Sequence, residues 1–167
     1  VCSSDLPLTY TNGFLDTSVG LFASRKPFVY VRGNHETRGA YARNFFRYLA
    51  GPEGKFYYAF TYGPIRFIVL DSGEDKPDTD VEYSGLVDFD NYILEQKEWL
   101  ARELESPEFR AASFRVVLSH IPFGKGSWYG SERLRKHCQH RVIGVHYYRE
   151  SCNFPLIHKS ECVIMPT

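Results

Sequence analysis

The chain has 167 residues, a length that suits about one domain, and its formal net charge is zero. With a net charge of zero, no basic footprint argues for nucleic acid or an anionic membrane as a partner. No apolar run is long enough to span a bilayer. Hydrophobic residues make up 43% and aromatic residues 16%, which favours a packed core built partly from Phe and Tyr.

The first six residues, VCSSDL, have no structural pattern and resemble the translated end of a DNA-sequencing adapter. We expect them to be an artefact, in which case the natural chain extends upstream and any signal peptide is lost, so localisation is left open. The alternative is a natural, frayed terminus.

Two helices and one strand are predicted in the first part of the chain. Residues 11–26 carry apolar side chains near helical spacing and stop at a proline. Residues 28–31, FVYV, have the length and composition of a strand. Residues 40–49 are predicted to form a second helix, which a Gly-Pro pair ends.

Three more strands and a long helix follow. Residues 56–61 and 65–70 are predicted to be strands joined in a hairpin through Tyr62, Gly63 and Pro64. Residues 74–88 are acidic and are predicted to be a long surface loop, residues 89–105 an amphipathic helix, and residues 114–118 a buried strand. This order predicts an α/β fold in which the apolar runs at 28–31, 65–70 and 114–118 share one sheet.

Polar side chains follow directly after the predicted strand at residues 28–31. Gly33 allows a sharp turn or close approach to a ligand, Asn34 offers an amide oxygen, and His35 can give or take a proton. His120 follows the predicted strand at 114–118 in the same way. Because ligands bind at the carboxyl ends of strands in open α/β sheets, we expect His35 and His120 to converge there.

The string Gly-Asn-His-Glu at residues 33–36 resembles the third signature block of the calcineurin-like metallophosphoesterases, which include the purple acid phosphatases. His120, followed by Pro122, resembles the fourth block of that family. The resemblance covers residues 7–135 and implies a truncated layered α/β sandwich with mixed sheets. It implies hydrolysis of a phosphate ester, as substrate, at a centre of two metal ions, with manganese, iron or zinc as the candidates.

The resemblance also implies roles for single residues. Asn34 and His120 would ligate one metal, and His35 would act on the leaving-group oxygen without ligating. Arg38 would contact the substrate phosphate, although it could equally pair with Glu36 or solvent-facing acids. For Asp71 we prefer a turn-forming role over support of the metal site.

Three blocks of the family pattern are missing: Asp-x-His and Gly-Asp before residue 33, and Gly-His-x-His after His120. We therefore expect residues 7–135 to be a partial domain that is inactive alone. A non-catalytic binding module on the same fold is the alternative. A Rossmann-like nucleotide binder is disfavoured because no Gly-x-Gly-x-x-Gly follows a strand. Oligomeric state stays open.

Residues 136–167 form a separate tail that holds three of the four cysteines and four histidines. A zinc cluster is one reading, but no Cys-x-x-Cys pair is present, and we favour a segment past a frameshift or misjoin. The body of the chain contains no cysteine, so no disulfide framework is expected there and the redox compartment stays undetermined.

Overall fold

The computed structural model describes residues 15–39, 41–49, 51–121 and 145–147, and its centre is a mixed four-stranded sheet. The strands lie side by side in chain order: β1 (Tyr58–Tyr62), β2 (Ile65–Leu70), β3 (Phe114–Ser119) and β4 (Val145–Tyr147). β1 and β2 are antiparallel, whereas β2, β3 and β4 run parallel. The predicted α/β class is therefore confirmed.

The hairpin between β1 and β2 turns at the predicted residues. Tyr62 pairs with Ile65, and Gly63 adopts a φ of 58°, a left-handed conformation that glycine reaches without strain. β1 begins two residues later than expected. Phe56 and Tyr57 instead pack as buried rings, with Tyr57 lying 5.1 Å from Trp99 between ring centroids.

A helical crossover joins the parallel strands β2 and β3. It consists of α4 (Phe89–Glu103) and α5 (Pro107–Ala111). The cap of α4 comes from the preceding loop, because the carboxylate of Asp78 accepts hydrogen bonds from the N–H groups of Phe89 (3.0 Å) and Asp90 (2.8 Å). The loop, predicted over residues 74–88, also contains the 3₁₀ turn η6 (Val81–Tyr83).

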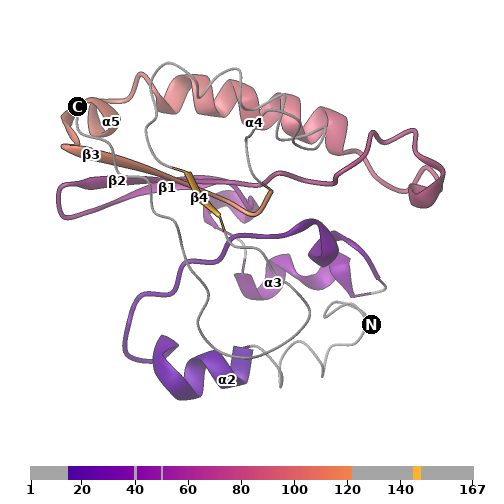
Figure 1. The fold of residues 1–167 in the computed structure, drawn as a ribbon, viewed down its shortest axis with the longest axis horizontal. Helices are drawn as coiled ribbons and strands as arrows, with labels where there is room; N and C mark the ends of the chain where they lie inside the picture. The colour runs from indigo at the N-terminus through magenta and orange to yellow at the C-terminus, as the bar shows by residue number, and fades with distance from the viewer. Residues whose placement is uncertain (1–14, 40, 50, 122–144, 148–167) are drawn as a thin grey trace.

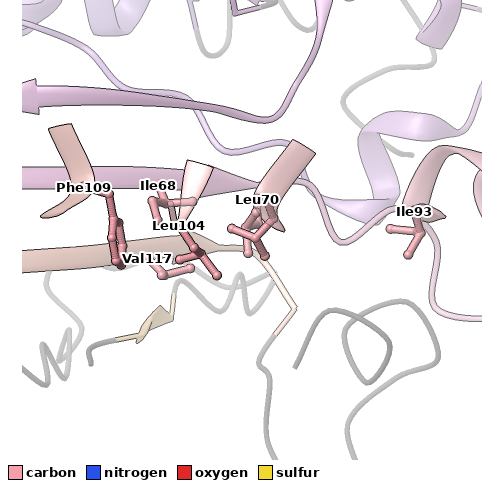
Figure 2. Packing of buried hydrophobic residues seen from close by; sticks show 7 residues of the cluster. Ile68, Leu70, Ile93, Leu104, Phe109 and Val117 are labelled. Carbon is pink, nitrogen blue, oxygen red and sulfur yellow. The ribbon is translucent and has the colours of Figure 1, made fainter. Parts of the chain in front are cut away.

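The main core lies between α4, α5 and the sheet. Figure 1 shows α4 and α5 on one side of the sheet and the N-terminal helices on the other. Figure 2 shows the facing side chains of the core, which are Ile68, Leu70, Ile93, Leu100, Leu104, Phe109 and Val117. Burying each aliphatic or aromatic side chain contributes roughly 1.5–3 kcal/mol to folding.

The predicted strand at residues 28–31 is wrong, because this extended segment is not part of the sheet. A strand needs a neighbour whose backbone completes the ladder, and among the described residues β1 pairs only with β2. Within residues 28–31, Tyr30 instead contributes to a second core cluster away from the sheet ladder. Tyr30 packs against Phe45, which forms this cluster with Phe56.

The N-terminal helices are shorter or less regular than predicted. In the described part of residues 11–26, α2 (Asp16–Ser18) continues as a π-helix, η2 (Val19–Ala23). In the described part of residues 40–49, the chain forms a 3₁₀ turn, η4 (Ala42–Asn44), and one short helix, α3 (Phe46–Leu49); η5 (Pro52–Gly54) comes next. Within the described residues, no helix has both the length and the apolar character needed to cross a membrane.

Replacing Leu100 with alanine should lower the free energy of unfolding by about 2–5 kcal/mol, because the side chain is fully buried against the sheet and leaves a cavity. Leu94→Ala in the same helix is the matched control, since that side chain is 42% exposed and should cost less than about 1 kcal/mol. Urea unfolding followed by circular dichroism measures both. Equal losses would contradict the assignment of this face of α4 to the core.

Candidate functional site

The GNHE turn, residues 33–36, opens the 3₁₀ helix η3 (Asn34–Thr37). The carboxylate of Glu36 accepts a hydrogen bond from the N–H of Gly33 at 2.9 Å, which closes the turn. The Thr37 hydroxyl shares its one proton between the carbonyl oxygen of Asn34 and the carboxylate of Glu74. Asn34 is 7% exposed, whereas His35 is open to solvent. The turn therefore holds the amide inside the protein and presents the imidazole outward.

His120 lies against this turn although 85 positions separate it from His35. A Cβ atom placed on Gly33 would lie 3.0 Å from two ring carbons of His120, so the imidazole packs on the glycine backbone. His120 reaches this place because it directly follows β3. The Ser119 hydroxyl donates to the carbonyl oxygen of Ile121 at 3.1 Å, which bends the chain after the strand. The segments that carry Asn34, His35 and His120 thus meet at Gly33.

A buried ion pair anchors the residue before the turn. The Nε and Nη2 atoms of Arg32 donate to one carboxylate oxygen of Asp71 at 2.9 and 2.5 Å. The guanidinium also lies 4.1 Å from the centroid of the Phe56 ring. Burial is the largest single effect and would lower the pKa of Arg32, but the charge and hydrogen bonds of Asp71 together with Tyr92 and Tyr30 outweigh it, so the pKa is raised. Arg32 therefore stays charged inside the protein.

Asp71 is itself bound from several directions at the end of β2. Its second carboxylate oxygen accepts from the N–H of Gly73 at 3.0 Å, so the preferred turn-forming role is present, together with the ion pair to Arg32. The Tyr92 hydroxyl donates to the carboxylate at 3.1 Å. Burial, and after it the charge of Asp71, raises the pKa of Tyr92, which keeps the phenol protonated as a donor.

Gln96 fixes the backbone of the same residue. The side-chain amide of this fully buried glutamine accepts from the N–H of Asp71 at 2.8 Å and donates to its carbonyl oxygen at 2.7 Å. Sequence reasoning missed Gln96 and Arg32. A signal for Gln96 exists, because it interrupts the apolar stripe of α4 between Ile93 and Leu100.

Arg38 is held by acids on the far side of the turn. Its guanidinium bonds to Glu74 at 2.7 Å and to Asp75 at 3.1 Å. These partners are largely buried acids, whereas the alternative drawn from the sequence was Glu36 or solvent-facing acids. Glu74 is 2% exposed and also accepts from the hydroxyls of Thr37 and Tyr83. The hydrogen bond to Glu74 is the main cause that raises the pKa of Arg38.

Asn34 and His120 carry donor atoms of a type that metal ions bind, but two such residues are too few to complete a metal site. An amide oxygen from Asn34 and an imidazole nitrogen from His120 are ligands that manganese, iron and zinc accept. The described residues contain no group of three or more His, Cys, Asp or Glu side chains able to hold a metal. They therefore fit part of one metal position and do not form a complete dinuclear cage. The frameshift or misjoin favoured for residues 136–167, and the alternative of a zinc cluster, concern residues that lie outside the described part of the chain except for 145–147, which form β4.

The mixed α/β fold and the contact of His120 with the GNHE turn agree with the resemblance drawn from the sequence. The chain belongs to the calcineurin-like phosphoesterase family, whose model matches residues 7–148. No curated protein and no solved structure matches the chain significantly. Members of the family are hydrolases that generally use a dinuclear metal centre, which supports metal-dependent phosphoesterase activity in general.

Replacing Gly33 with alanine should push apart the GNHE turn and His120, because the added Cβ would lie 2.5 Å from the carboxylate of Glu36 as well as near the imidazole. We expect a loss of about 1–3 kcal/mol in the free energy of unfolding. Gly20→Ala is the control, since its Cβ would meet nothing within 4 Å and should stabilise the helix by up to about 1 kcal/mol. Thermal unfolding distinguishes them. A neutral Gly33→Ala would contradict the close approach.

Proposed function

We propose that this protein is a metal-dependent phosphoesterase in which Asn34 and His120 ligate one metal of a dinuclear centre and His35 assists the leaving group. The observation that carries the proposal is the packing of the His120 imidazole on Gly33, directly before Asn34. Membership of the calcineurin-like phosphoesterase family supports the same reaction class. Manganese, iron and zinc are the candidate metals.

The roles proposed for Asn34 and His35 differ because the first residue is buried and the second is exposed. When bound, two metal ions activate water and clamp the phosphoryl oxygens. Asn34 is buried and its backbone is tied to Thr37, so its amide is held in one place for ligation. His35 is exposed, where its imidazole can give a proton or a hydrogen bond to the oxygen of the departing alcohol.

Arg38 is proposed to contact the substrate phosphate. Its side chain is about a third exposed and lies directly after η3. A guanidinium carries five N–H donors, so a phosphate contact would add to the bonds with Glu74 and Asp75. Those acids would then orient Arg38 and hold it in place before substrate arrives.

Further metal ligands would come from residues outside those that the structure describes, and we propose that the chain is an incomplete copy of the catalytic domain. A purple acid phosphatase-like site would add a tyrosine ligand in the block before the GNHE turn. The second candidate function is a non-catalytic binding module. It would be favoured if the full gene also lacked the Asp-x-His, Gly-Asp and Gly-His-x-His blocks.

The chain should bind Mn²⁺ weakly, because two protein ligands leave a divalent ion mostly hydrated, whereas catalytic sites usually supply about three. Asn34→Ala and His120→Ala should each remove most of this binding. Asn91→Ala is the control, since that side chain is exposed on α4 and bonds only locally to Asp88. Isothermal titration calorimetry measures the affinities. Unchanged affinity in both site variants would refute the ligand assignment.

The chain should hydrolyse p-nitrophenyl phosphate with added manganese far more slowly than a longer chain that also carries the Asp-x-His, Gly-Asp and Gly-His-x-His blocks. In that longer chain, His35→Ala should lower kcat about 10²–10⁴-fold, as expected for loss of a general acid. Steady-state kinetics measures both effects. If the two chains were equally active and His35→Ala abolished both activities, the proposed need for further ligands would be wrong.

A further inference from the structure

Two buried carboxylates on one loop bind the two arginines that flank the GNHE turn. Asp71 pairs with Arg32 before the turn, and Glu74 pairs with Arg38 after it. We propose that Asp71 and Glu74 are positioning residues, which fix the turn and thereby the amide of Asn34 for metal binding. This inference rests on the proposed function for the role of Asn34, while the clamping of the turn can be tested separately.

The turn needs such a clamp because of where it sits in the fold. A loop that follows a sheet strand is held by the ladder hydrogen bonds of that strand. Residues 28–31 are not a strand of the sheet that the described residues form, so the ladder bonds of that sheet do not fix the chain where it enters Gly33. The bonds from Arg32 to Asp71 then supply a fixed point one residue before the turn.

The fixed point is rigid because Asp71 is held by the core. Its backbone is bonded in both directions by Gln96, and its carboxylate accepts from Tyr92. Both side chains project from α4, the helix that packs against β2 and β3. A displacement of Asp71 would therefore break several buried hydrogen bonds at once, and each broken bond would leave a buried polar group unpaired.

Glu74 closes the other end of the turn. Its carboxylate accepts from Arg38, from the hydroxyl of Thr37 in η3, and from the hydroxyl of Tyr83 in η6. A side chain that is 2% exposed and negatively charged is costly to bury unless all its oxygens are paired, as they are here. Asp71 and Glu74 are three residues apart, so a single loop holds both arginines that flank the GNHE turn.

The test measures amide hydrogen exchange of the whole chain by mass spectrometry in Asp71→Asn and Glu74→Gln. Both variants should increase exchange in the peptide spanning residues 33–38 by about tenfold or more. Glu103→Gln is the matched control. This substitution weakens the two-bond ion pair between Glu103 of α4 and Arg66 of β2, whose side chains are 10% and 12% exposed. It should leave exchange in the peptide spanning residues 33–38 unchanged. Unchanged exchange at residues 33–38 in both test variants would overturn the proposal.

Mn²⁺ affinity, measured by calorimetry, separates positioning from a merely structural role. The two test variants should lose about 10–100-fold in affinity, and Glu103→Gln should lose little even when its melting temperature falls as far. Faster exchange with unchanged Mn²⁺ affinity would overturn the positioning role. If both variants exchange faster and the wild-type chain binds no Mn²⁺, the proposed function is refuted while the clamp on the turn is supported. If Asp71→Asn does not fold, Tyr92→Phe, which removes one hydrogen bond to Asp71, should give an intermediate increase in exchange.

Discussion

The structure around the site depends on one constraint, which is that the buried carboxylate of Asp71 must be paired. An isolated charge in a protein interior is costly, so the surroundings must supply donors and a counter-charge. Arg32 supplies the charge, and Tyr92 and the N–H of Gly73 supply further donors. These groups come from three segments that are far apart in the sequence. Satisfying one carboxylate therefore joins the end of β2, helix α4 and the chain leading into the GNHE turn.

The meeting of His120 with the GNHE turn is a consequence of backbone proximity and depends on a glycine. The conformation of Gly33 is ordinary, with a φ of −94°, so its value here is the missing side chain and not a special dihedral angle. The imidazole of His120 occupies the space that a Cβ would need. The position of His120 is fixed by β3, which ends at the residue before it. The start of the turn is fixed by the ion pair of Arg32 with Asp71. The two can therefore meet although the residues before the turn do not form a sheet strand.

Sequence patterns predicted the elements whose stability comes from local periodicity and burial. The bounds of β2 and the start of α4 were predicted correctly, because apolar runs and a 3.6-residue stripe report directly on packing against a core. The same reasoning failed at residues 28–31, because strand composition does not say whether a neighbouring strand edge is available. The pair of Arg32 and Asp71 spans 39 positions, and no spacing rule connects charges at that distance. The site residues Asn34, His35 and His120 came from motif resemblance, and their roles stay predictions.

The arginine clamps also decide which groups remain for a metal ion. Asp71 and Glu74 are the carboxylates beside the turn whose side chains are almost fully buried, and each is neutralised by an arginine. Recruiting Asp71 as a ligand would take the carboxylate away from Arg32, and breaking a buried pair costs about 3–5 kcal/mol. Recruiting Glu74 would remove the shorter of the two ion pairs of Arg38 and leave the pair with Asp75. The ligands proposed at this place are then the neutral amide of Asn34 and the imidazole of His120. Because a divalent ion held by neutral donors keeps its full charge, anionic ligands from elsewhere or the phosphate itself must balance it.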